Sequence, residues 1–161
     1  MHLVLDLKLL LLLGAANGVP LFANAILRHR LAHPLDGGVM LWGEPLLGPA
    51  KTIRGIILSI LLTGAVAPLV GLAWWIGVLI AVAAMIGDIC SSFWKRRLKL
   101  PSSSMAVGID QLPESLLPLL TSAFVLPLTV ADVVLTASCF FAGEILLSRI
   151  LYRLHLRDRP Y

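Results

Sequence analysis

The stretch that decides the fold spans residues 72–99 and reads LAWWIGVLIAVAAMIGDICSSFWKRRLK. Its first part is apolar, whereas its end carries one carboxylate, two hydroxyls and several cations. About 20 mostly apolar residues are needed to cross the hydrocarbon core of a bilayer. We therefore expect a membrane span from about Leu72 to Ile86, which continues as a helix towards Lys99.

The composition of the whole chain supports a membrane protein. Of 161 residues, 58% are hydrophobic and 14% are charged, and the mean hydropathy is +0.92. Soluble domains contain roughly 45–50% apolar and about 25% charged residues, so this chain cannot supply a polar exterior. The net charge of +4 is typical of basic loops that orient a membrane protein. We expect an all-α integral membrane protein, a single domain over residues 1–161, with the bilayer and not nucleic acid as its partner.

Four more apolar segments complete the expected bundle of about five transmembrane helices. The region after Ser115 is too long for one span, and Pro127 and Asp132 divide it into two. Two polar loops, at about Arg28 to Arg54 and Leu100 to Leu112, separate the spans. The four further spans are predicted at about Leu7 to Leu27, Gly55 to Val70, Leu116 to Leu128 and Val133 to Tyr152.

The distribution of Lys and Arg predicts the orientation of the bundle. Basic residues gather in the first polar loop, in the segment 95–99 and in the tail from Arg153. The connections near Gly71 and between Leu128 and Asp132 carry none. Five spans place all three basic segments on one side, which the positive-inside rule identifies as cytoplasmic. We expect a multi-pass protein of the cell membrane with its N-terminus outside and its C-terminus in the cytoplasm.

The segment GDICSSFWKRRLK, residues 87–99, presents chemical groups on one helical face. At about 100° per residue, four residues lie within about 60° of Asp88: Ser91, Ser92, Lys95 and Lys99. Arg96 lies near the edge of that face, and Arg97 points away from it. The carboxylate could hold Mg²⁺, and the cations could neutralise phosphates. A solvated helix end with snorkelling Lys and Arg explains the same pattern equally well.

Two other polar segments carry candidate ligands. In GPAKTIRG, residues 48–55, Lys51 and Arg54 would share a face on a helix and could meet phosphate. Taken alone, that segment is more typical of a basic juxtamembrane anchor. In GIDQLPES, residues 108–115, Asp110 and Glu114 could bind a metal ion or simply complement the helix dipole.

Glu144 lies near the middle of the last predicted span. An ionised carboxylate is costly there, and intramembrane carboxylates usually face the protein interior. We expect Glu144 to face the bundle, either in a functional role or as a protonated group bonded to a neighbouring helix.

The three polar motifs, taken in chain order at residues 48–55, 87–99 and 108–115, resemble the CDP-archaeol synthase family. That family is related to the membrane phosphatidate cytidylyltransferases, and the resemblance covers most of the chain. The resemblance implies transfer of CMP from CTP to a lipid phosphate, with release of pyrophosphate and with Mg²⁺. Three residues would then be catalytic: Asp88, Asp110 and Lys95. CTP and phosphate would be bound by Lys51, Thr52, Arg54, Ser91, Ser92 and Arg96, and the metal by Asp88, Asp110 and Glu114.

One position departs from the family pattern, which commonly places a second Asp three residues after the first. Here that position is Pro113, and we hypothesise that Glu114 replaces the missing carboxylate beside Asp110. The acceptor could be an archaeol-type lipid phosphate or phosphatidate. The alternative function is that of a small non-enzymatic transporter or anionic-lipid-binding protein, which would not explain carboxylates beside the cations of both loops.

The five-span topology predicts that a cysteine introduced near His155, in a variant lacking Cys90 and Cys139, reacts with an impermeant thiol reagent only from the cytoplasmic side. A cysteine near Gly71 should react only from outside, since that connection lies at the other end of two spans. Labelling of the His155 position from the outside of intact cells would contradict this topology.

Overall fold

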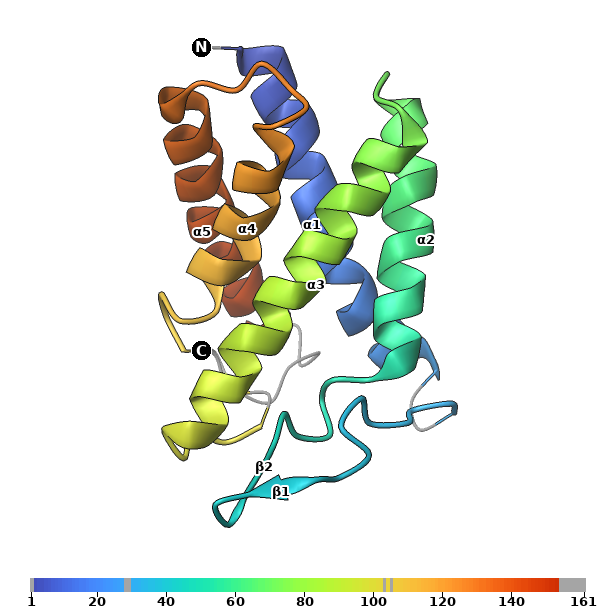
Figure 1. The fold of residues 1–161 in the computed structure, drawn as a ribbon, viewed down its shortest axis with the longest axis vertical. Helices are drawn as coiled ribbons and strands as arrows, with labels where there is room; N and C mark the ends of the chain where they lie inside the picture. The colour runs from blue at the N-terminus through green and yellow to red at the C-terminus, as the bar shows by residue number, and fades with distance from the viewer. Residues whose placement is uncertain (1, 28–29, 103, 105, 154–161) are drawn as a thin grey trace.

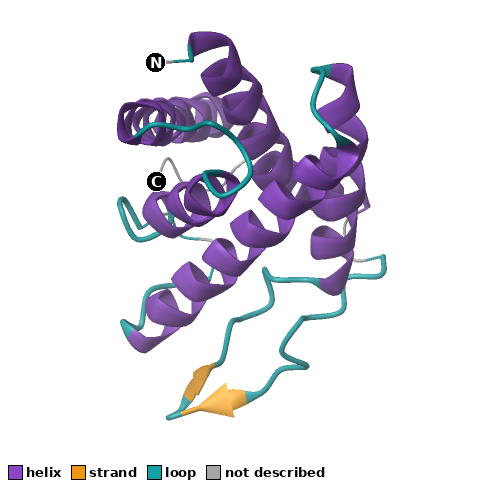
Figure 2. Cartoon of the chain, turned by 45° about the horizontal axis from the view of Figure 1, so that its top comes forward, coloured by secondary structure: helices purple, strands orange, loops and turns teal. Residues whose placement is uncertain are grey.

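The protein is a bundle of helices with a small β-hairpin at one end (Figures 1 and 2). The computed structural model describes residues 2–27, 30–102, 104 and 106–153. Within them lie the helices α1 (Leu3–Leu27), α2 (Ile53–Leu69), α3 (Trp74–Arg97), α4 (Gln111–Ser122) and α5 (Val130–Arg153). The antiparallel strands β1 (Met40–Leu41) and β2 (Glu44–Pro45) form the hairpin. Successive helices run in opposite directions (Figure 1).

This architecture confirms the predicted all-α membrane bundle and adds the hairpin, which the sequence did not predict. Three described helices are long and apolar enough to cross a membrane, within Leu3–Asn24, Trp74–Arg97 and Val130–Ile150. Helix α2 is a shorter apolar helix of 17 residues. Helix α4 has only 12 residues, which corresponds to about 18 Å of rise against a hydrocarbon core of ~30 Å. Helix α4 is therefore too short to reach both membrane surfaces.

The boundaries of two helices differ from those expected. Helix α3 ends at Arg97, and Lys99 follows with a left-handed φ of 57°, so Lys99 leaves the predicted helical face. Helix α4 begins at Gln111 rather than near Leu116. It starts early because the side chains of Asp110 and Gln111 accept hydrogen bonds from the amides of the preceding loop.

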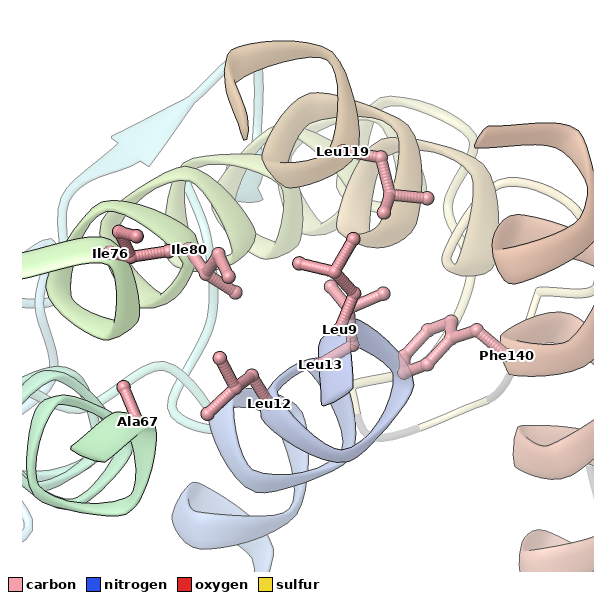
Figure 3. Packing of buried hydrophobic residues seen from close by; sticks show 8 residues of the cluster. All are labelled: Leu9, Leu12, Leu13, Ala67, Ile76, Ile80, Leu119 and Phe140. Carbon is pink, nitrogen blue, oxygen red and sulfur yellow. The ribbon is translucent and has the colours of Figure 1, made fainter. Parts of the chain in front are cut away.

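The apolar core lies against the face of α1 that is turned to the other helices (Figure 3). Leu9, Leu12 and Leu13 of α1 are fully buried, and α1 packs against all four other helices. The other members come from α2 to α5: Ala67, Ile76, Ile80, Leu119 and Phe140. Burial by protein rather than lipid gives no hydrophobic gain inside a bilayer, so close packing must hold these helices together.

Small residues allow α2 and α3 to cross closely. A side chain at Gly77 would clash with the carbonyl oxygen of Thr63 and would place its Cβ 2.8 Å from the Cβ of Ala67. Gly71, in the turn between the two helices, has a φ of 73°, a conformation that suits glycine. Trp74 and Trp75 are exposed at the start of α3, where an aromatic belt is expected.

A polar contact joins α1 and α5 at the end of the bundle opposite the hairpin. The fully buried Asp132 accepts hydrogen bonds from the backbone nitrogen of His2 at 2.9 Å and from the amide and hydroxyl of Thr129. Thr129 caps the start of α5, because its hydroxyl accepts a hydrogen bond from the amide of Asp132 at 3.3 Å while Asp132 accepts one from the amide of Thr129. Asp6 is buried near this contact.

The arrangement agrees with the predicted alternation of the spans. The first polar loop and the end of α3 lie together at one end of the bundle, and the start of α1 lies at the other (Figure 1). We call the former the basic end, because it carries Lys51 and the segment 95–99. His155 and the rest of the tail lie outside the described residues, so the tail's orientation stays a prediction.

The Gly77→Ala variant should unfold at a lower temperature than the wild type in detergent, because the new methyl group would meet backbone and side-chain atoms of α2. Overpacking of this kind typically costs about 1–3 kcal/mol. The matched control is Gly143→Ala in α5, where nothing lies within 4 Å of the new Cβ. That variant should be neutral or slightly stabilised, since alanine favours a helix by up to about 1 kcal/mol. Equal unfolding temperatures for the two variants would contradict the close packing of α2 and α3.

Candidate active site

The first polar loop delivers Lys51 to the basic end of the bundle. The carboxylate of Asp36 accepts hydrogen bonds from the backbone amides of Gly38, Leu47 and Gly48, at 3.0, 2.8 and 3.1 Å. Three bonds from amides outweigh the opposing effect of burial and lower the pKa of Asp36, so the group is ionised at neutral pH. Asp36 thus has the turn-forming role that its His-Pro-Leu-Asp-Gly-Gly context favours, and it places the segment that leads into Lys51.

Arg97 fixes the hairpin from the other side. Its guanidinium donates hydrogen bonds to the carbonyl oxygens of Leu41 and Pro45. It also lies 5.6 Å from the ring centre of Trp42 and 5.3 Å from that of Phe93, within the range of cation–π attraction. The helical geometry correctly predicts that Arg97 points away from Asp88. Its role in holding the hairpin could not be predicted, because the partners lie in a distant loop.

Gly87 sets the distance between α3 and α4. A side chain there would clash with the carbonyl oxygen of Pro113 and would place its Cβ 2.9 Å from the backbone nitrogen of Glu114. Only glycine allows so close an approach. The contact places the first turn of α4 directly against Asp88, the next residue of α3.

Lys51, Asp88, Ser91 and Glu114 form the centre of the site. The ammonium group of Lys51 makes an ion pair with the carboxylate of Asp88. The carboxyl group of Glu114 lies close enough to that of Asp88 for the two groups to interact electrostatically. The Ser91 hydroxyl lies 3.5 Å from Oε1 of Glu114. Three separate parts of the chain therefore meet here: the first polar loop, α3 and α4.

A second ion pair lies beside this centre. Nζ of Lys95 is 2.8 Å from Oδ1 of Asp110 and donates a hydrogen bond to the carbonyl oxygen of Ser104 at 3.0 Å. Asp110 also accepts a hydrogen bond from the amide of Ala106 at 2.8 Å. Lys95 and Asp110 are only 7% and 8% exposed, so each neutralises a charge that would be costly if it were unpaired.

The two pairs act on each other electrostatically. The carboxylates of Asp88, Glu114 and Asp110 attract the ammonium group of Lys51. Lys95 in turn attracts the carboxylate of Asp88. Burial alone would lower the pKa of Lys51, but Asp88 and Glu114 more than offset that effect and raise it above its ordinary value. Lys51 therefore remains a cation at neutral pH. We call these six residues the charged cluster: Lys51, Asp88, Ser91, Lys95, Asp110 and Glu114.

Three other predicted site residues serve the loops around the cluster. Thr52 caps α2 by accepting a hydrogen bond from the amide of Gly55 at 3.2 Å. Arg54 donates to the carbonyl oxygen of Arg30 and to the side-chain oxygen of Asn24 at 2.7 Å. Arg96 donates to the carbonyl oxygen of Pro101 at 2.7 Å. Ser92 is buried in α3.

The structure corrects two details of the predicted site. Lys51 and Arg54 do not share a helical face, because α2 begins at Ile53 and Lys51 precedes it. The carboxyl group of Glu114 meets Asp88 and not Asp110. The reason is that Lys95 and the amide of Ala106 hold Asp110, while Gly87 brings Glu114 against α3.

Glu144 of α5 is half-buried and interacts electrostatically with Glu114. It therefore faces the bundle, as the cost of exposing a carboxylate to hydrocarbon predicts.

The donor atoms of the cluster suit a hard cation. The described residues contain no group of three or more His, Cys, Asp or Glu side chains placed to hold a metal ion. Mg²⁺, however, is often held by one or two carboxylates, with waters and substrate phosphates completing its shell. The carboxylates of Asp88 and Glu114 and the hydroxyl of Ser91 are oxygen donors of this kind.

Fold and site together define a multi-pass membrane protein with a charged cluster between helices at its basic end. A family profile described as CarS-like CDP-archaeol synthase matches residues 70–161. A CDP-archaeol synthase of Pyrobaculum calidifontis is 33% identical over 156 residues, which cover 91% of this chain and 90% of that relative. This chain belongs to the CDP-archaeol synthase family.

Other relatives match over shorter segments. A CDP-archaeol synthase of Hyperthermus butylicus is 38% identical over 105 residues, covering 61% of this chain and 60% of that relative. One of Thermococcus onnurineus is matched over 54% of its length, so the chain spans little more than half of these two relatives. A solved structure of an intramembrane enzyme for archaeal membrane lipids biosynthesis is 29% identical, with a TM-score of 0.74 over 87% of this chain and 90% of that one.

Proposed function

We propose that the protein is a membrane cytidylyltransferase, which transfers CMP from CTP to a lipid phosphate and forms a CDP-activated lipid. The observation that carries this proposal is the charged cluster, in which two lysines and three carboxyl groups from three separate segments meet between the helices. Membership of the CDP-archaeol synthase family supports CTP as the nucleotide and an archaeol-type phosphate as the acceptor. Phosphatidate is the alternative acceptor of related chemistry.

The reaction needs charge stabilisation more than acid–base catalysis. An oxygen of the lipid phosphate attacks the α-phosphorus of CTP. The bond from that phosphorus to the oxygen bridging the α- and β-phosphates breaks, and pyrophosphate leaves. The nucleophile is already an anion, so no general base has to remove a proton. The difficulty lies in bringing two anions together, which fixed cations in a dry site relieve.

Residues of the charged cluster divide this work. Lys51 and Lys95 would neutralise phosphate oxygens as point charges. Asp88 and Glu114, with Asp110 nearby, would hold Mg²⁺, which screens the triphosphate and the charge that develops on pyrophosphate. Ser91 lies where its hydroxyl can orient a carboxylate or donate to a phosphate oxygen. Thr52, Arg54 and Arg96 keep the surrounding loops in place and so orient the cluster.

The shortness of α4 gives the lipid a route to the cluster. Helix α4 begins within the depth of the bundle (Figure 1), so its first turn, which carries Glu114, lies at the level of the helices rather than in an outer loop. A lipid phosphate at the membrane interface and a nucleotide from the aqueous phase can both reach this level. With the basic end in the cytoplasm, as the positive-inside rule predicts, the nucleotide would enter from the cytoplasmic side.

Pyrophosphate release tests the function directly. Purified protein in lipid vesicles should release pyrophosphate only when CTP, Mg²⁺ and a lipid phosphate are all present. A panel of archaeol-type phosphate and phosphatidate would identify the acceptor, and ATP in place of CTP would test the base. Binding of lipid or movement of solute without pyrophosphate release would favour the alternative, a non-enzymatic transporter or lipid-binding protein.

The Asp88→Asn variant keeps the shape of the side chain but removes its charge. Turnover should fall by about two orders of magnitude or more, a loss typical of removing one preorganised electrostatic group, while the unfolding temperature changes little. Asp6→Asn, which alters a buried carboxyl at the opposite end of the bundle, is the matched control and should keep near-normal turnover. Normal turnover in a folded Asp88→Asn protein would reject a catalytic role for Asp88.

The Glu114→Gln variant tests whether Glu114 supplies the second carboxylate. If it holds metal with Asp88, turnover should drop strongly and the Mg²⁺ concentration for half-maximal rate should rise. If Glu114 only complements the dipole of α4, worth under ~1 kcal/mol, turnover at saturating Mg²⁺ should stay near that of the wild type. An unchanged Mg²⁺ dependence would contradict the ligand role.

A further inference from the structure

Both lysines of the charged cluster are already engaged by carboxylates. Lys51 is ion-paired with Asp88, and Lys95 is ion-paired with Asp110. These are the groups that the proposed function assigns to phosphate and to metal. In the structure described, each phosphate-binding cation therefore neutralises a metal-binding carboxylate.

Such a pairing makes the site a poor receptor for either ligand alone. A metal ion that takes the carboxylate of Asp88 leaves the ammonium of Lys51 without its counter-charge. A phosphate that takes Lys51 leaves Asp88 unpaired. Lys51 and Asp88 are each about one-fifth exposed, and Lys95 and Asp110 about one-tenth, so water compensates for the lost partner only in part. Removing one partner of a buried ion pair is strongly destabilising.

A metal ion and a polyphosphate together remove this penalty. The carboxylates exchange lysine for metal, and the lysines exchange carboxylate for phosphate, so no charge is left without a partner.

We infer that the two lysine–carboxylate pairs make metal and nucleoside triphosphate bind cooperatively and disfavour the binding of either one alone. We call this pair of exchangeable ion pairs the latch. This inference rests on the proposed function and adds a mechanism of selection to it. Linkage requires the coupling to be reciprocal: the metal strengthens triphosphate binding by the same factor by which the triphosphate strengthens metal binding.

The latch makes a prediction that a simple metal-ligand role for Asp88 does not make. The Asp88→Asn variant frees Lys51, so CTP should bind about tenfold more tightly to it than to the wild type when chelator removes all metal, within the ~5–150-fold range of typical couplings. The gain in affinity on adding Mg²⁺ should shrink in the same variant. Isothermal titration of CTP into detergent-solubilised protein measures both.

The matched control for this arm is Glu114→Gln. It changes another carboxyl group of the same cluster. In the described part of the chain, that carboxyl group forms no ion pair with Lys51. It should not show the tenfold gain in metal-free CTP affinity. An equal gain in both variants would mean that any reduction of negative charge suffices, and it would overturn the latch.

The reciprocal arm uses metal alone. Lys51→Met frees Asp88, so Mn²⁺ without nucleotide should bind about tenfold more tightly than to the wild type, as followed by the electron paramagnetic resonance of free Mn²⁺. Lys8→Met, which removes a cation near Gly71 at the opposite end of the bundle, should leave Mn²⁺ affinity unchanged. This arm also decides the matter if Asp88→Asn fails to fold.

The outcomes separate the latch from the function on which it rests. Mn²⁺ affinity in Lys51→Met no higher than in the wild type would overturn the latch, as would metal-free CTP affinity in a folded Asp88→Asn protein no higher than in the wild type. Wild-type protein that binds no CTP even with Mg²⁺ and releases no pyrophosphate would instead contradict the proposed function, and the inference would fall with it.

Discussion

The close approach of α3 and α4 at Gly87 is the constraint on which the site depends. Any side chain at this position would push the first turn of α4 away from α3, and Asp88 would lose its contact with Glu114. A similar contact at Gly77 holds α2 against α3, so α3 is the element to which both neighbours are fitted. Inside a bilayer this fit matters more than apolarity, because lipid is as apolar as the helices and only packing and polar contacts favour association.

The charges of the basic end fall into two groups with different tasks. Lys51 and Lys95 pair with carboxylates of the charged cluster. The arginines instead donate to backbone carbonyl oxygens of the loops: Arg54 to Arg30, Arg96 to Pro101, and Arg97 to the hairpin. The division follows from their chemistry, since a guanidinium has several donors in a fixed plane whereas an ammonium is a compact charge that changes partners readily. The arginines thus hold the loops beside the cluster, whereas the lysines pair with its carboxylates.

Local sequence determined much of the protein. The apolar runs and the uneven distribution of cations define a helical membrane bundle. The reason is that the composition of a segment alone decides whether it lies in the lipid or in water. The shared face of Asp88, Ser91 and Lys95 also follows from the sequence, since helical geometry depends only on spacing. The departure of Arg97 from that face follows for the same reason.

Tertiary structure alone decided which charges meet. Lys51 reaches Asp88 across 37 positions, and Lys95 meets an aspartate of the following loop. Spacing could not distinguish Lys51 from Arg54, because their roles depend on where α2 begins and on how Asp36 and Arg97 shape the loop. Glu114 lies beside Asp88 because Gly87 of α3 has no side chain to keep the two helices apart. Long-range pairing of buried charges depends on how helices pack, and that information lies in the contacts between segments rather than in any one of them.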